Sequence, residues 1–217
     1  MLMIRKIGIT GIGLLLGLNL LFAQAAVPME DAAEIAGFKQ AVAKAAAAVQ
    51  NLKSDFIQTK SLGFLDEKVV SDGLFYYARE KKIRWEYQKP YAFSFIINGN
   101  KAWMLNKAAK TEIDTRSNNM FRELSELMLF GIGGTDLFDS PRFAFSFAVS
   151  ENAWMVTLEP KAKEIKKLYS YIRISFSKKD LQVTGIYMQE ASGDITDIVF
   201  TNRKINTDVP DTLFLVN

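Results

Sequence analysis

Two rows of alternating aromatic residues are the most prominent chemical feature of this 217-residue sequence. The rows are Phe143, Phe145 and Phe147 in RFAFSFAVS, and Phe93 and Phe95 in YAFSFII. Because alternate side chains of a β-strand leave opposite faces of the sheet, each stretch presents one strongly apolar face. Such a face can fill a core or bind an apolar ligand, and the sequence leaves both possibilities open.

The side chains that most often carry out catalysis are absent. The sequence contains no His and no Cys, so zinc sites and the common pairs of nucleophile and base lack their groups. Carboxylates and lysines are present, but no paired motif arranges them for acid–base chemistry. We therefore predict a protein that is not an enzyme and that uses no cofactor and no metal.

A series of strands with short turns must position the aromatic rows. Windows with a period of two run from Ser54 to Asn106 and again from Arg142 to Asn206. Turns are predicted at 71–73, 98–99, 151–152, 178–180 and 192–194. This pattern predicts a mainly β (α+β) fold, an incomplete antiparallel β-barrel or strongly curved sheet. A sheet of about ten strands encloses more space than its own side chains fill, so we expect a hydrophobic cavity.

Two helical windows carry apolar stripes that could cover such a cavity. Residues 29–52 place Phe38 and other apolar side chains at helical spacing, and residues 117–130 do so with Leu124, Leu127 and Met128. We predict that these four residues belong to a helical lid. The GIGG segment at 131–134 would end the second helix.

A cavity without His, Cys or a cluster of buried charges is suited to an aliphatic chain. Burial of an acyl chain contributes roughly 0.8 kcal/mol per CH₂. The residues predicted to line this lipid-binding cavity share the apolar faces of their strands, and they are Ile83, Trp85, Tyr87, Phe93, Phe95, Phe143, Phe145 and Phe147.

The first 25 residues have the layout of a cleaved secretory signal peptide. Arg5 and Lys6 precede an apolar run from Ile7 to Phe22, and Ala23-Gln24-Ala25 forms a small-x-small cleavage site. An uncleaved anchor is the alternative. We predict that residues 1–25 are removed and that residues 26–217 form a single domain without disulfides. Its net charge falls from +3 to +1, which argues against nucleic acid as a partner.

Several short motifs resemble the family of periplasmic outer-membrane lipoprotein carrier proteins (LolA). They stand in the order and spacing of that family over nearly all of the chain after residue 25, and they are FIQTK (56–60), Gly73, Arg79, Trp85, Lys89-Pro90, INGNKAWMLN (97–106), LEPK (158–161) and a final Phe-containing strand. The resemblance implies an unclosed barrel with a helical lid, in which Ile83 and Trp85 face inward. It also implies that Arg79 hydrogen-bonds to the lid as a latch, although Glu80, at a position where the family often has proline, could compete for Arg79.

The function implied by this resemblance is transport without chemistry. Such a protein is periplasmic and soluble after signal cleavage, and it carries the acyl chains of lipoproteins from the inner to the outer membrane. Its partners would be acylated lipoproteins, an inner-membrane ATP-driven lipoprotein release transporter and an outer-membrane acceptor, and it would act as a monomer. A binder of another lipid or acyl product with the same fold is the alternative. An integral outer-membrane barrel is disfavoured, because Arg84 and Glu86 flank Trp85 where a lipid-facing band would have to be apolar.

Overall fold

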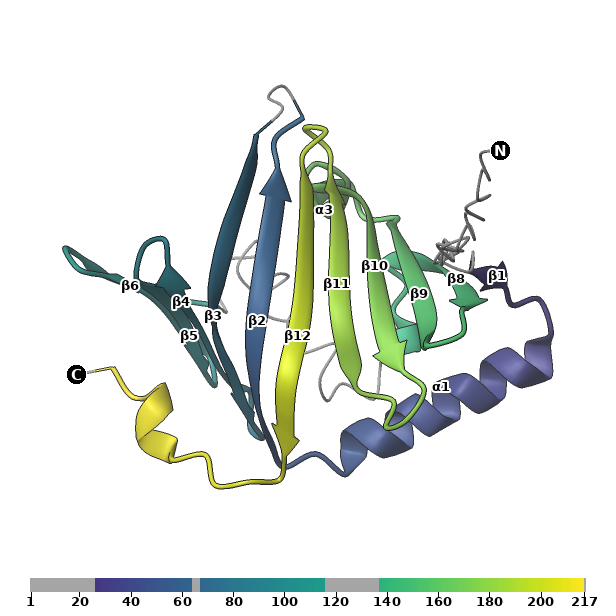
Figure 1. The fold of residues 1–217 in the computed structure, drawn as a ribbon, viewed down its shortest axis with the longest axis horizontal. Helices are drawn as coiled ribbons and strands as arrows, with labels where there is room; N and C mark the ends of the chain where they lie inside the picture. The colour runs from purple at the N-terminus through teal and green to yellow at the C-terminus, as the bar shows by residue number, and fades with distance from the viewer. Residues whose placement is uncertain (1–25, 64–66, 116–136, 217) are drawn as a thin grey trace, which may run out of the picture.

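The computed structural model describes residues 26–63, 67–115 and 137–216, and its main feature is one antiparallel sheet of twelve strands (Figure 1). The strands, in chain order, are β1 (Val27–Pro28), β2 (Asn51–Ser61), β3 (Lys68–Ala78), β4 (Lys82–Lys89), β5 (Phe93–Asn98), β6 (Lys101–Asn106), β7 (Lys110–Asp114), β8 (Phe143–Val149), β9 (Ala153–Pro160), β10 (Tyr169–Ser177), β11 (Val183–Glu190) and β12 (Ile195–Ile205). The helical elements are α1 (Ala32–Ala47), α3 (Lys163–Lys166) and the 3-10 turns η1 (Leu137–Asp139) and η2 (Asp211–Phe214). The predicted mainly β fold is confirmed.

The strand order shows how the two halves of the chain join. Across the sheet the order is β1-β8-β9-β10-β11-β12-β2-β3-β4-β5-β6-β7, so most neighbours are consecutive in sequence. The central pair β12 and β2 is the main exception, with Ile195 opposite Ser61 and Ile205 opposite Leu52. In the described part of the chain the edge strands β1 and β7 do not pair with each other. The sheet is therefore curved but not closed into a barrel.

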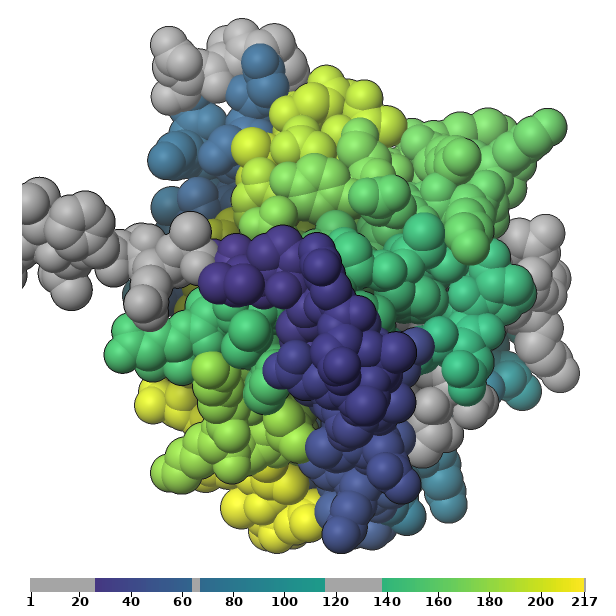
Figure 2. Space-filling view, turned by 90° about the vertical axis from the view of Figure 1, so that its right-hand side faces the viewer, coloured from purple at the N-terminus to yellow at the C-terminus, as the bar shows by residue number. Residues whose placement is uncertain are grey.

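Helix α1 covers one end of this sheet, as Figures 1 and 2 show. It begins at an N-cap, Asp31, whose carboxylate accepts a hydrogen bond of 2.7 Å from the Glu34 backbone N–H. It ends at Ala47, five residues before the end of the predicted window 29–52. Val49 and Leu52 are still buried, but they pack against the sheet from the loop and from β2 rather than from a helix.

The turn predicted at 71–73 is wrong, because β3 continues through these residues. Gly73 lies instead at a bulge in the pairing of β3 with β4. An added Cβ at Gly73 would stand 1.9 Å from the Glu86 carbonyl oxygen, so this position requires glycine for the close approach of two backbones. The turn predicted at Asn98-Gly99 is confirmed: β5 and β6 pair as far as Asn98 and Lys101, and Gly99 has a φ of 62°.

The final Phe-containing strand is confirmed as β12, which contains Phe200. After β12 the chain forms η2, in which Phe214 lies. This turn packs against β4 and β5, and the Phe214 side chain is fully buried. The Arg84 Nη1 donates to the Leu213 carbonyl at 3.2 Å, and the Asn98 amide donates to the Phe214 carbonyl at 3.4 Å. Pairing with these polar side chains gives the last carbonyls partners that a strand ladder would otherwise supply.

Two predictions fall outside the described residues. They are the signal peptide at 1–25 and the second helical window, which contains the lid residues Leu124, Leu127 and Met128 and the GIGG segment. In the ranges that the structure does describe, no helix has both the length and the apolarity needed to cross a membrane.

Candidate binding cavity

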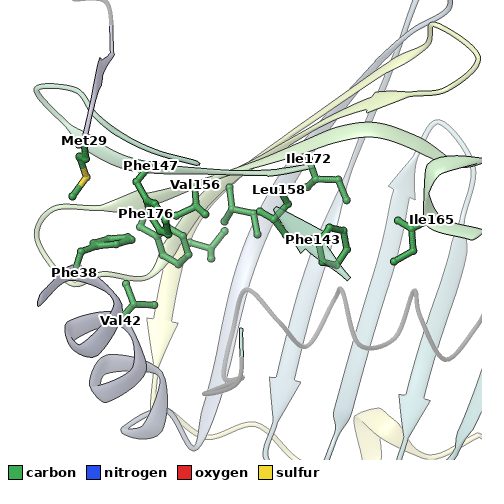
Figure 3. Close-up of a cluster of buried hydrophobic side chains, with 12 residues drawn as sticks. Met29, Phe38, Val42, Phe143, Phe147, Val156, Leu158, Ile165, Ile172 and Phe176 are labelled. Carbon is green, nitrogen blue, oxygen red and sulfur yellow. The ribbon is translucent and has the colours of Figure 1, made fainter. Parts of the chain in front are cut away.

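A cavity of about 160 Å³ lies between two hydrophobic clusters on one face of the sheet, which we call the inner face. The first cluster joins α1 to β8–β11 and includes Phe38, Phe147 and Phe176 (Figure 3). The second lies on β2–β6 and β12 and includes Phe75 and Trp85. Three side chains on the inner face contact both clusters: Ile186, Met188 and Phe200. All three line the cavity, so the cavity marks the seam between the clusters.

A row of isoleucines forms the floor of the cavity. Ile174, Ile186 and Ile198 stand directly opposite one another on β10, β11 and β12, and Gln58 of β2 continues the row. Because residues opposite each other on neighbouring strands point to the same face, one register brings all four side chains to the cavity. The floor is thus apolar over three strands and polar at the fourth.

Aromatic side chains form the wall that β3 and β4 contribute. The Phe75 and Trp85 rings lie 5.2 Å apart between centroids at an angle of 72°, an edge-to-face arrangement. The Tyr87 hydroxyl donates a hydrogen bond of 2.8 Å to Gln58 Oε1. The indole N–H of Trp85 is buried and has no hydrogen-bond partner among the described residues. The wall is therefore mostly apolar, with one satisfied polar pair where it meets the floor.

Burial raises the pKa of the Tyr87 phenol from 10.0 to about 12. The folded state therefore keeps this proton in a range of pH where the unfolded chain has lost it. The stabilising contribution is complete below pH 10 and is lost as the pH rises through the folded-state pKa.

We predict that the free energy of unfolding falls less in the Tyr87→Phe variant than in wild type when the pH is raised from about 9 to about 11.5. The two falls should differ by roughly 2 kcal/mol. The free energy of unfolding, measured with urea at each pH, checks this. The variant should still lose some stability at alkaline pH, because burial also raises the pKa values of Tyr76, Tyr77 and Tyr169. An unchanged pH dependence in the variant would show that Tyr87 titrates normally in the folded protein.

The predicted lining residues divide into three groups. Trp85 and Tyr87 line the cavity. Ile83, Phe93 and Phe95 belong to the second cluster or pack against it, beside the aromatic wall. The row Phe143, Phe145 and Phe147 lies in the first cluster instead, where η1 and α1 cover it. The structure thus brings two of the eight to the described cavity, and an acyl-binding role for the eight residues stays a prediction.

Phe38 is the one predicted lid residue that the structure describes. Its ring centroid lies 5.3 Å from that of Trp154, 5.8 Å from Phe176 and 6.2 Å from Phe147 (Figure 3). Phe38 therefore joins α1 to the aromatic row of β8, and this contact must separate if α1 moves away from the sheet.

Most of the cavity comes from strands in which no site residue was predicted. Most of the missed apolar residues lie on β10–β12, and these are Ile172, Ile174, Val183, Ile186, Met188, Ile198 and Phe200. Their alternation in YIRISFS, TGIYMQE and DITDIVF is a detectable signal. It could not show which rows meet, because the pairing of β12 with β2 joins residues 147 apart in sequence, as at Ser54 and Thr201.

Arg79 contacts the end of α1. Its Nε donates to the Val49 carbonyl at 3.1 Å, and its Nη2 donates to the Ala47 carbonyl. Asn206 supports the same segment, since its amide donates to the Ala48 carbonyl at 3.0 Å. The last carbonyls of a helix have no partners within the helix, so these side chains act as a C-terminal cap. Among the described residues no ion pair joins Arg79 to Glu80.

We predict that Arg79→Ala lowers the free energy of unfolding by about 1 kcal/mol, the usual contribution of an exposed capping interaction. Faster amide hydrogen exchange in residues 44–49 should accompany the loss. Glu80→Ala is the matched control and should change stability by less than about 0.5 kcal/mol. Equal effects of the two substitutions would contradict a specific cap by Arg79.

Several known proteins are similar to this chain in sequence or in fold. The family model described as outer membrane lipoprotein carrier protein LolA matches residues 47–217. An outer-membrane lipoprotein carrier protein of Methylococcus capsulatus is 25% identical over 170 residues, which cover 76% of each chain. Another, from Chromobacterium violaceum, is 26% identical over 196 residues, covering 86% of this chain and 91% of that protein. An uncharacterized conserved protein from Thermus thermophilus has a similar fold, with a TM-score of 0.50, 11% identity and coverage of 83% of this chain and 92% of that one. Since the family model spans well over half of the sequence, this chain belongs to the family of outer membrane lipoprotein carrier proteins, LolA.

Proposed function

We propose that this chain is a periplasmic carrier that binds the acyl chains of lipoproteins on its inner face and moves them from the inner to the outer membrane. The apolar cavity between the two clusters is the observation that carries the proposal. Its floor and most of its wall consist of aliphatic and aromatic side chains, which favour an aliphatic ligand. The names of the related carriers support the choice of lipoproteins as cargo.

The cavity must widen to accept a whole acyl chain. Engineered apolar cavities of about 150 Å³ hold a molecule the size of benzene, and the described cavity of about 160 Å³ is similar in volume. Only part of an acyl chain fits in such a space. We infer that the acyl chain enters the seam and separates the first cluster from the second. This separation would bring the predicted residues Phe143, Phe145 and Phe147 into contact with the acyl chain.

Helix α1 is the described element best placed to control this widening. Phe38 and Val42 join it to the first cluster. Its C-terminal end is capped by Arg79 and Asn206, which follow β3 and β12, two strands of the second cluster. A lid attached through its middle and at its C-terminal end would hold the clusters together when no cargo is present. Arg79 would then act as the latch, because loss of its hydrogen bonds frees the C-terminal end of α1.

The proposed role needs reversible binding and no covalent chemistry, so we infer that the protein is not an enzyme. Its partners would be acylated lipoproteins, an inner-membrane ATP-driven transporter that releases them and an outer-membrane acceptor. A cleaved signal peptide at 1–25 would bring the protein to the periplasm, where residues 26–217 would act as a monomer.

The test is native mass spectrometry of the protein purified from periplasm without detergent, with identification of the extracted lipids. A co-purified acylated lipoprotein in a 1:1 complex is the expected result. A different bound lipid would keep the cavity as a binding site but replace lipoproteins as its cargo. An empty protein whose mass does not increase when an acylated peptide is added would refute acyl binding.

A further inference from the structure

Arg203 gives the cavity a charged end. Of the described residues that line the cavity, Arg203 is the one that carries a formal charge, and its side chain is only 17% exposed. Ser54 and Gln182, which are polar and buried, line the cavity with it. A buried charge in an apolar site is costly unless it is paired, so its presence in a binding cavity calls for an explanation.

A β-bulge places the Arg203 side chain on the inner face. The register of β12 against β2 shifts between Thr201 and Lys204, so that Asn202 and Arg203 both stand opposite Ser54. Asn202 has a φ of 52°, and its amide donates to the Asp55 carboxylate at 2.6 Å, on the outer face. With Asn202 directed outward, Arg203 takes the inner position that regular alternation would have given to Asn202. Bulges commonly redirect a side chain in this way beside functional sites.

The guanidinium of Arg203 has capacity for a further partner. Its Nη2 lies 3.4 Å from Asp180 Oδ2, and its Nη1 lies 3.5 Å from Asp180 Oδ1 and 3.3 Å from the Val183 carbonyl. Strong charge-assisted hydrogen bonds are shorter, about 2.7 to 2.9 Å. The described structure records no hydrogen bond from Nε, although a guanidinium offers five N–H donors. Asp180 therefore balances the charge loosely and from the solvent side, with its side chain 38% exposed.

We propose that Arg203 binds the oxygen-bearing head of the acyl ligand, a carboxylate or an acyl carbonyl, and so fixes the direction in which the ligand lies. The inference rests on the proposed function and adds the polar group that the cavity recognises. The acyl tail would then follow the isoleucine floor toward Gln58 and Tyr87 at the other end of the cavity. Leu52 and Gln58, which mark the two ends on β2, are six residues apart, or about 20 Å along a strand.

The test compares three acyl probes of equal chain length in competition with the neutral fluorescent probe N-phenyl-1-naphthylamine. The probes are dodecanoic acid, methyl dodecanoate and an N-dodecanoyl peptide amide. Arg203→Met removes the guanidinium but keeps a long apolar side chain, and Arg173→Met is the matched control. Arg173 lies on the outer face of β10, which β11 separates from β12, and its guanidinium lies over the Tyr171 and Tyr187 rings. Asp180→Asn removes the existing ion-pair partner of Arg203 and leaves the guanidinium in place.

Wild type should bind dodecanoic acid about tenfold more tightly than its methyl ester, as expected for one charge-assisted contact. Arg203→Met should lose this preference for the acid, whereas Arg173→Met should behave as wild type. Asp180→Asn should bind the acid at least as tightly as wild type, because a competing carboxylate is gone. A loss of peptide affinity in Arg203→Met would identify an acyl carbonyl as the head, and a loss confined to the acid would identify a carboxylate.

Two results separate the inference from the proposed function. If wild type and Arg203→Met bind all three probes with equal affinity, the cavity binds acyl chains but Arg203 does not recognise their heads, and the inference fails alone. If wild type binds none of the probes, acyl binding itself fails. If Asp180→Asn loses as much affinity for the acid as Arg203→Met, the role of Arg203 is to pair with Asp180, and the inference is wrong.

Discussion

Ile186→Glu is expected to reduce the affinity for an acyl ligand by about 100-fold, or roughly 3 kcal/mol. Ile186 is at the centre of the isoleucine floor, between Ile174 and Ile198. A carboxylate there must either remain charged against an apolar chain or become protonated at a cost, and both weaken binding. Displacement of N-phenyl-1-naphthylamine by an acylated peptide measures the loss.

Val199→Glu is the matched control for this substitution. Val199 lies on β12, next to Ile198 in sequence but on the outer face, and it is 46% exposed. The same change of residue type there should leave acyl binding as in wild type. Ile186→Phe is a second test in case Ile186→Glu does not fold, since a larger apolar side chain fills part of the cavity without adding charge. It should fold with near-normal stability and bind about tenfold more weakly. Normal acyl affinity in both Ile186 variants would place the ligand elsewhere.

Gly73→Ala is expected to lower the free energy of unfolding by roughly 3 kcal/mol or more. The added Cβ would lie 1.9 Å from the Glu86 carbonyl oxygen and 2.8 Å from the Phe56 ring. The first of these atoms belongs to the backbone of β4, so the sheet must shift to relieve the contact. Because Phe56 is packed against Trp85 and Tyr87, the shift would also disturb the aromatic wall of the cavity.

The same substitution at Gly37 should instead raise the free energy of unfolding. Gly37 lies in the middle of α1, and an added Cβ there meets no atom within 4 Å. Alanine in the interior of a helix is more favourable than glycine by about 0.5 to 1 kcal/mol. Urea denaturation of both variants therefore yields a destabilised and a stabilised protein. If both lose stability equally, the steric argument at Gly73 is incorrect.

The local pattern of the sequence predicts the strands well because side-chain alternation follows directly from strand geometry. The rows around Phe145, Trp85 and Phe95 all lie in strands, and the Asn98-Gly99 hairpin has the turn residues that it requires. The same reasoning fails at Ser71-Asp72-Gly73, since glycine after polar residues is typical of a turn and also of a bulge. Close approach of a second backbone decides between them, and sequence does not contain that information.

The site is less predictable than the strands because it depends on long-range pairing. The row Phe143, Phe145 and Phe147 and the row of Trp85 and Tyr87 look alike in sequence. Only the first is covered by α1, and only the second borders the cavity. Arg203 was missed for a different reason. Strict alternation from Phe200 would place Arg203 on the outer face, and the bulge at Asn202 reverses that assignment.

The central position of β12 also limits when the cavity can form as the chain folds. The strands β2–β7 and β8–β11 can each pair as hairpins with near neighbours in sequence, and such local contacts form quickly. β12 then has to join the two sets, and it supplies Ile198, Phe200 and Arg203 to the cavity, while Asn206 just beyond it caps α1. A nascent chain shortened before residue 195 therefore has two separate apolar surfaces and no seam between them. The capacity to hold a ligand arises only with the last strand, so an unfinished or truncated chain exposes its aromatic rows to aggregation before it can bind cargo.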